Sequence, residues 1–140
     1  MQLTKHTDYA FRILIYLASM SEARTTIQCM TDSLKISKSH TMKIVNKLAN
    51  QGWLSASRGK SGGIALGVEP KVISLKAVVE LMEQTLAPVN CESPLCVLNN
   101  SCQLRGILWN AQQQYLDYLA DFTLKDLLSQ DTDDLIRLIE

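Results

Sequence analysis

Apolar residues recur at three- and four-residue steps over the first fifty positions, and this spacing predicts three consecutive helices. We expect them at residues 4–20, 26–35 and 38–50, with Ser37 as the N-cap of the third. Cys29, between two apolar neighbours on the second helix, is expected in the core. The other inward residues expected are Tyr9, Ile13, Tyr16, Leu17 and Met20 in the first helix, Ile27, Met30 and Leu34 in the second, and Met42, Val45, Leu48 and Ala49 in the third.

The pattern then changes to two short alternating runs, 53–57 and 63–67, around the basic, glycine-rich segment 58–63. This predicts a β-hairpin. Helical spacing returns after Pro70, with Ser74 as cap. The inward residues of this helix are expected to be Leu75, Val78, Val79 and Met82.

A long helix is predicted after residue 103, and its length is typical of a dimer strut. A last helical piece is expected at 123–128, and residues 131–140 are expected to fray. The apolar positions of the long helix are Leu104, Ile107, Leu108, Ala111, Tyr115, and Tyr118 or Leu119.

These elements together predict a mainly α fold with a small β-hairpin wing, that is, a winged helix-turn-helix followed by a long C-terminal dimerisation helix. We divide the chain into a DNA-binding domain at 1–86, a cysteine loop at 87–103 and a dimerisation helix with an acidic tail at 104–140.

Charge is balanced overall, with 14 Lys plus Arg against 14 Asp plus Glu, but it is unevenly distributed. No acidic residue lies between Asp32 and Glu69, whereas acidic residues dominate after Trp109. A basic helix preceding a basic hairpin suits DNA, because the major groove admits one helix and the wing can reach a neighbouring groove. The expected DNA-binding residues are Ser37, Lys38, Ser39, His40, Thr41, Lys43 and Lys47 on the helix, and Arg58 and Lys60 on the wing.

Three cysteines, Cys91, Cys96 and Cys102, lie within twelve residues among turn-forming residues. Their spacing is longer than that of most structural zinc sites and suits an iron–sulfur cluster. A zinc site completed by Asp8, or a bare thiol switch, remains an alternative. The apolar stretch 13–18 is too short for a signal-peptide core or a membrane span, so we expect a cytoplasmic protein with reduced thiols.

Enzymatic function is not expected. The chain has no glycine fingerprint for a dinucleotide and suggests no nucleophilic triad or paired carboxylates. An electron carrier would leave the basic helix and wing without a purpose.

Several segments together resemble the iron–sulfur winged-helix repressors, and within them the NsrR-type nitric-oxide sensors, with IscR as a relative. They are Met1-Gln-Leu-Thr4, Thr7-Asp8-Tyr9, the Arg58-Gly-x-x-Gly-Gly63-Ile-x-Leu66 wing, Asn90-Cys91 and the C-x4-C-x5-C loop. The resemblance covers the chain to about Leu128 and implies a homodimeric repressor that binds a palindromic operator.

The resemblance also implies the ligands. Cys91, Cys96 and Cys102 match the thiolates of the cluster, and Asp8 matches the carboxylate that the partner subunit contributes in NsrR-type proteins. Arg105 stands where IscR-type proteins have a histidine, which favours a [4Fe-4S] over a [2Fe-2S] cluster, with nitric oxide attacking the iron as the signal. Asp8 has an alternative role, in the helix dipole or in an ion pair with Arg12.

Overall fold

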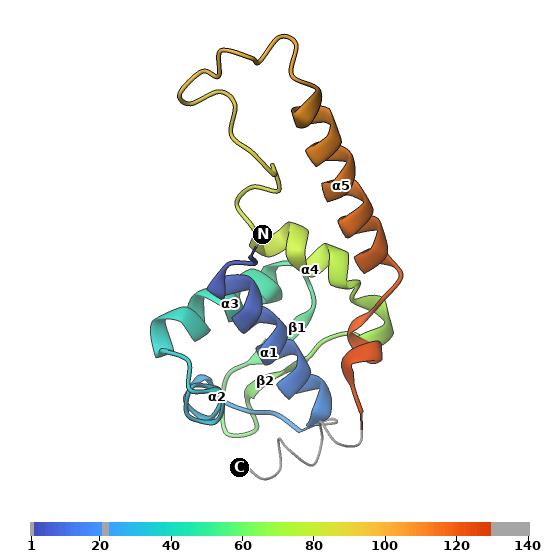
Figure 1. Cartoon of the computed structure of the whole chain (residues 1–140). Helices are drawn as coiled ribbons and strands as arrows, with labels where there is room; N and C mark the ends of the chain where they lie inside the picture. The colour runs from blue at the N-terminus through green and yellow to red at the C-terminus, as the bar shows by residue number, and fades with distance from the viewer. Residues whose placement is uncertain (1, 21–22, 130–140) are drawn as a thin grey trace.

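The computed structural model describes residues 2–20 and 23–129, and the first three helices of the chain lie in the body of the molecule (Figure 1). Each helix begins at a hydroxyl residue whose side chain accepts a hydrogen bond from a backbone N–H of the first turn, which satisfies a donor that the helix itself leaves free. These caps are Thr4, Thr26 and Ser37. The helices are α1 (Lys5–Ser19), α2 (Ile27–Leu34) and α3 (Lys38–Asn50).

The core forms around α1, because the helices on either side of it bury their apolar faces against this helix. Helix α3 differs from the expected stripe: Thr41 and Ile44 are buried with Val45 and Leu48, whereas Met42 is 47% exposed. Residues of the core that are at most 1% exposed include Ile13, Leu14, Tyr16, Leu17, Met30, Leu48, Ile73, Val78 and Leu124.

The expectation for Cys29 was wrong. Its side chain is exposed on α2, because that short helix turns only Met30 fully inward.

The hairpin confirms the predicted wing, with β1 (Leu54–Ser57) antiparallel to β2 (Gly63–Leu66). A backbone bridge joins Thr25 to Ile64, with N···O distances of 2.9 and 2.7 Å. The hairpin is therefore held to the segment that precedes α2.

A short 3₁₀ turn, η1 (Pro70–Val72), leads into α4 (Leu75–Met82). Ser74 occupies the predicted N-cap position of α4, but its side chain makes no capping bond. The predicted last helical piece is the 3₁₀ turn η2 (Leu124–Leu127), and Leu124 N–H donates to the Ile73 carbonyl at 2.8 Å. This bond returns the chain to the core after the long helix.

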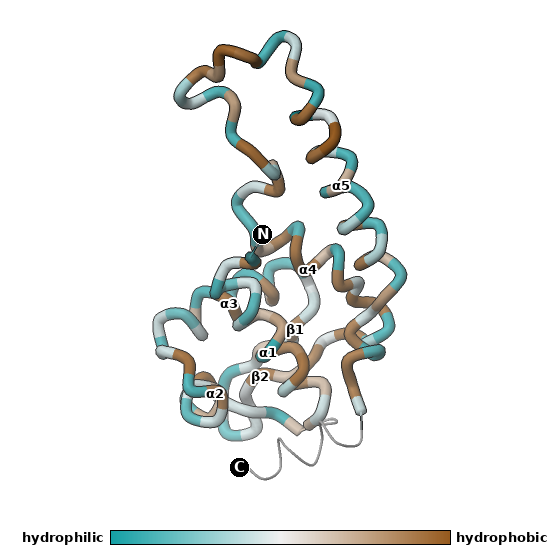
Figure 2. The backbone as a smooth tube through the Cα atoms, viewed as in Figure 1, coloured by the Kyte–Doolittle hydropathy of each residue, from teal (hydrophilic) through white to brown (hydrophobic). Residues whose placement is uncertain are grey.

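Helix α5 (Gln103–Ala120) and the loop before it, which contains Cys91, Cys96 and Cys102, rise from the body as an arm (Figures 1 and 2). The mainly helical fold with a two-stranded wing and a long C-terminal helix is confirmed. No helix in the described part of the chain is long and apolar enough to span a membrane. The acidic tail from residue 130 onward lies outside the described residues, and the three-part division of the chain stays a prediction.

Candidate functional site

The outer face of α3 is polar and basic. Lys38, Ser39, Lys43 and Lys47 are exposed, and His40 is half-buried. Because α3 lies on the body with this face outward, its side chains are available to a groove of DNA. Ser37 is exposed as well, and its hydroxyl caps the helix by accepting the His40 N–H at 3.4 Å.

Thr41 does not belong to this face. Its side chain is 0% exposed, and its hydroxyl donates to the Ser37 carbonyl at 3.1 Å. The Thr31 hydroxyl also donates to it at 3.4 Å. Thr41 therefore joins α2 to α3 inside the protein, and its prediction as a DNA contact is corrected.

At the wing tip, Arg58 and Lys60 are exposed and flank Gly59, whose φ is +106°. Gly62 permits the tight turn, because a Cβ there would lie 2.5 Å from the Ser57 carbonyl oxygen. Two cations are thus carried on a narrow turn with little side-chain bulk between them.

Arg24 supports the wing and was not found from the sequence. Its guanidinium donates to the Gly63 carbonyl at 3.0 Å and to the Ser55 hydroxyl at 3.2 Å. A lone arginine in a short connection carries no pattern that indicates such a role, because both partners lie more than thirty residues away in the chain.

The cysteine loop contains three free cysteines, Cys91, Cys96 and Cys102, all half-buried. The Cys96 N–H donates to the Cys91 carbonyl at 3.0 Å, which closes a turn between these two residues. The side-chain oxygen of Asn90 accepts from the N–H groups of Glu92 and Ser93 at 3.0 and 3.1 Å. The first part of the loop is therefore ordered by its own hydrogen bonds.

Cys102 is the N-cap residue of α5 and makes no side-chain capping bond. Its backbone therefore begins α5 while its sulfur makes no capping contact with that helix. Arg105, one turn later, donates to the side-chain oxygen of Asn99 at 2.8 Å and so links α5 to the loop.

The donor set fits an iron–sulfur cluster by its chemistry, since thiolates are the usual ligands of such clusters. The sulfurs are not gathered in advance: across residues 2–20 and 23–129, no group of three or more His, Cys, Asp or Glu side chains is arranged to hold a metal ion. Binding at this loop would therefore draw the three cysteines together and order the loop.

Asp8 lies on the first turn of α1 and forms a two-point ion pair with Arg12, with Nη2···Oδ2 and Nε···Oδ1 distances of 2.7 and 3.1 Å. About half of each side chain is exposed. Within a single chain, Asp8 thus has the second of its two predicted roles.

Glu83, directly after α4, joins the end of that helix to the start of α1. Its Oε1 accepts from the Thr4 N–H at 2.8 Å, from the Thr4 hydroxyl at 3.0 Å, and from the Thr7 hydroxyl. Burial raises the pKa of Glu83, but these hydrogen bonds outweigh that effect and hold the pKa below its ordinary value. The first turn of α1 is thereby attached to the residue from which the chain enters the arm.

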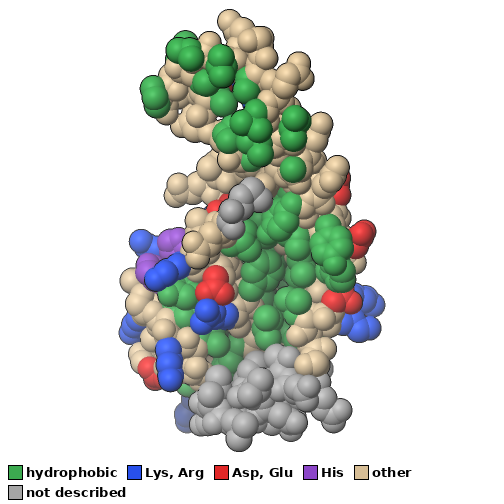
Figure 3. Space-filling view, in the orientation of Figure 1, with side chains coloured by type: hydrophobic (Ala, Val, Ile, Leu, Met, Phe, Trp, Pro, Cys, Tyr) green, Lys and Arg blue, Asp and Glu red, His purple; other side chains and the backbone are tan. Residues whose placement is uncertain are grey.

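Hydrophobic side chains are exposed along the arm (Figure 3). At the loop tip Leu95 is 72% and Val97 98% exposed, and on α5 Ile107 is 63% and Tyr118 65% exposed. The apolar stripe predicted for α5 therefore lies largely outside the fold of one chain. The buried side of α5 is formed by Gln112 and Leu116.

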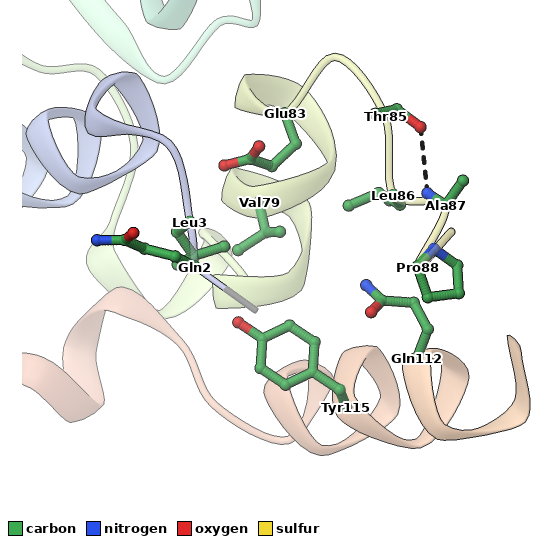
Figure 4. Close-up of a pocket in the computed structure, with 10 residues that line it drawn as sticks. All are labelled: Gln2, Leu3, Val79, Glu83, Thr85, Leu86, Ala87, Pro88, Gln112 and Tyr115. Atoms are coloured by element: carbon green, nitrogen blue, oxygen red, sulfur yellow. Dashed lines mark hydrogen bonds between the residues drawn. The ribbon is translucent and has the colours of Figure 1, made fainter. Parts of the chain in front are cut away.

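A depression of about 430 Å³ lies where the arm meets the body, between α4, α5 and the residues before α1 (Figure 4). Gln112, Tyr115 and Glu83 line it together with Leu3 and Pro88. Gln112 is 6% exposed, and its Oε1 has no hydrogen-bond partner among the described residues. The Gln112 amide oxygen is therefore available to a group that enters this depression.

Solved structures of other proteins share this architecture. Solved structures similar to it include CymR (YrzC), the global cysteine regulator of B. subtilis, with 26% identity and a TM-score of 0.73 over 91% of this chain and 95% of that chain. The oxidized form of Staphylococcus aureus CymR has 22% identity and a TM-score of 0.72 over 91% and 95% of the two chains. T. potens IscR has 16% identity and a TM-score of 0.73 over 91% and 85%.

The family model for Rrf2, described as an iron-dependent transcriptional regulator, matches residues 3–130. This range includes the winged helix, the cysteine loop, α5 and η2. The chain therefore belongs to the Rrf2 family of DNA-binding transcriptional regulators.

Proposed function

We propose that this protein is a homodimeric repressor whose affinity for a palindromic operator is set by an iron–sulfur cluster, most simply [4Fe-4S], with nitric oxide as the signal. The observation that carries the proposal is the loop of three free cysteines that leads directly into α5, in a chain matched by an iron-dependent regulator family. The cytoplasm, where such a regulator meets DNA, is the proposed location.

The proposed DNA surface consists of the outer face of α3 and the wing tip. The side chains there can donate hydrogen bonds or neutralise phosphates. The segment from residue 33 to residue 68, which contains α3 and the wing, has no acidic residue. The proposed contacts are Ser37, Lys38, Ser39, His40, Lys43, Lys47, Arg58 and Lys60.

The proposed dimer forms through the apolar stripe of α5. Rrf2 regulators typically act as dimers, and exposed apolar side chains at helical spacing are the usual surface for pairing two helices. The unpartnered Oε1 of Gln112 beside this stripe supports a second copy at the base of the arm. Two winged helices would then read two half-sites about one helical turn of DNA, or a multiple of it, apart.

In this proposal Cys91, Cys96 and Cys102 hold the cluster, and Asp8 of the partner subunit supplies the remaining ligand. A bound cluster would supply iron that reacts with nitric oxide. A carboxylate binds iron more weakly than a thiolate does, so Asp8 would leave one corner easier to displace. To serve in this way, Asp8 must exchange its ion pair with Arg12 for the metal.

The route from the loop to DNA would pass through the first turn of α1. Glu83 fixes Thr4 and Thr7 of that turn at the point where the chain enters the arm, and Asp8 lies on the same turn. A change in the order of the loop can therefore alter the position of α1 against α3, and the two positions form a two-state switch.

The cluster is tested by anaerobic purification with iron and sulfide analysis and visible absorption, comparing Cys96→Ala with Cys29→Ala. Cys96→Ala should lose the chromophore, because the loop offers no other soft ligand. Its affinity for the operator should then no longer depend on the cluster. Cys29→Ala is the matched control: it removes an exposed thiol outside the loop and should keep full iron and sulfide content. Full iron content in Cys96→Ala would refute the ligand assignment.

A thiol switch is the second candidate function, favoured by three free cysteines within one loop that are not arranged to hold a metal ion among the described residues. In that case purified protein is colourless and peroxide forms a disulfide between loop cysteines. A zinc site would also be colourless but would contain zinc. A [2Fe-2S] cluster would contain half as much iron and half as much sulfide per chain as a [4Fe-4S] cluster. Nitric oxide titration, followed by absorption and by operator binding together, tests the signal.

A further inference from the structure

Basic side chains also gather beside α3, between the start of α1 and the end of α4. His6, Lys43 and Lys47 line a depression of about 380 Å³ there, with Thr4 and Gln84. Lys43 and Lys47 lie one turn apart on α3, and His6 is exposed on the first turn of α1. Two separate elements thus contribute donors to one hollow.

The two carboxylates nearest to His6 and Gln84 in sequence are not paired with the lysines of the hollow. Glu83 is bonded to Thr4 and Thr7, and Asp8 is paired with Arg12. The residues that line the hollow include no acidic side chain. Within the described part of the chain, neither of the two lysines forms an ion pair, so two ammonium groups line the hollow against one neighbouring carboxylate, that of Glu83.

The His6 ring packs against helix α3. It meets the His40 ring edge-on, with the centroids 5.0 Å apart and the ring planes at 84°. Tyr9, on the next turn of α1, also lies beside the His40 ring, with the ring centroids 6.0 Å apart. His6 is therefore positioned next to the N-terminal turn of α3, where the proposed base contacts begin.

We propose that His6, Lys43 and Lys47 together bind one phosphodiester group of the operator backbone, so that the DNA interface extends from α3 onto the first turn of α1. Two ammonium groups and an imidazole N–H around one hollow match the charge and the acceptor oxygens of a phosphate. The inference rests on the proposed placement of α3 in the major groove and adds to it a contact from a helix that the sequence pattern did not assign to DNA.

The experiment compares wild type, His6→Ala, His6→Phe and Arg58→Ala on two duplexes, an operator selected with the wild type from a random library and a scrambled duplex of equal length. His6→Phe keeps a ring against His40 but removes both ring nitrogens. Both His6 variants should bind about tenfold more weakly, by the same factor on either duplex, because a phosphate contact carries no sequence information. Circular dichroism and urea unfolding confirm that the exposed substitutions leave the fold intact.

Wild-type affinity in His6→Phe with weak binding in His6→Ala would show that the ring only positions His40, and would overturn the phosphate contact. A loss confined to the operator duplex would overturn it too, since it indicates base reading. If both His6 variants bind like the wild type while Arg58→Ala is weak, this inference alone fails. If Arg58→Ala also binds normally, the proposed DNA surface itself fails.

Discussion

Asp8 forms an ion pair with Arg12 in the structure, and we propose that it also serves as a cluster ligand in the partner subunit. Its carboxylate is paired with Arg12 over two hydrogen bonds, yet it remains about half exposed on a turn that Glu83 holds beside the entrance to the arm. An exposed ion pair of this kind contributes only about 0.3–0.5 kcal/mol, so exchanging it for a metal bond across the proposed dimer would cost little.

Asp8→Ala and Arg12→Ala separate these roles, because both remove the ion pair but only the first removes the carboxylate. We expect each to lower the free energy of unfolding by about 0.3–1 kcal/mol in urea titrations. Only Asp8→Ala should also destabilise the proposed cluster, measured as a faster loss of its visible absorption, and alter the rate at which the cluster reacts with nitric oxide. Equal cluster behaviour in the two variants would leave Asp8 with its structural role alone.

At the scale of elements, the wing depends on a close approach between β2 and the segment before α2. Gly63 has a φ of +137°, and a Cβ there would lie 2.8 Å from the Thr25 carbonyl oxygen and 3.1 Å from Arg24 Cβ. Thr25 pairs with Ile64, the next residue of β2, and Arg24 donates to the Gly63 carbonyl. Glycine is needed here both for its backbone angle and for the space.

Gly63→Ala should therefore destabilise the protein by about 1–3 kcal/mol, with the loss measured by urea unfolding. Gly59→Ala is the matched control, because Gly59 also has positive φ, +106°, but nothing lies within 4 Å of its Cβ position. It should cost only the backbone strain, about 1–2 kcal/mol. If the two variants lose the same stability, the contact with Thr25 yields without cost and the packing argument is wrong.

On the scale of the whole molecule, the arm carries the surface that we propose a second copy covers. Its apolar loop tip and α5 stripe are exposed, and Gln112 carries an unpaired buried oxygen at its base. The body, by contrast, has a core in which α1, α3, α4 and η2 each bury residues that are fully enclosed. The winged helix is thus complete in one chain, whereas the arm requires a second copy in our proposal.

Ile107→Glu tests that requirement by placing a charge in the centre of the stripe. We expect dimerisation to weaken roughly a hundredfold or more in sedimentation experiments across a concentration series, because the interface would bury an unpaired carboxylate. Operator affinity should fall with it, since a monomer reads only one half-site. Gln113→Glu, on the opposite side of α5 and exposed, should remain dimeric. A dimeric Ile107→Glu protein would place the interface elsewhere.

The order and type of the elements were readable from the sequence, because helical periodicity, hydroxyl caps such as Ser37 and a glycine-rich turn act over a few residues. The cysteine loop was readable for the same reason, since its three sulfurs lie close together in the chain. The rotation of each helix about its own axis was less accessible: only the packing of α3 in the core decides that Thr41 is buried and Met42 exposed.

Tertiary structure alone brought together groups that are distant in the chain. Glu83 holds Thr4 and Thr7 from 79 and 76 residues away, and His6 meets His40 between two helices. No local pattern specifies such pairs, because they arise when the apolar faces of α1, α3 and α4 pack and fix the relative positions of the polar residues at their ends. The sequence therefore determined the elements and the loop of thiols, and the packing of the core decided which side chains lie on the outer face of α3 and which connect the arm to the body.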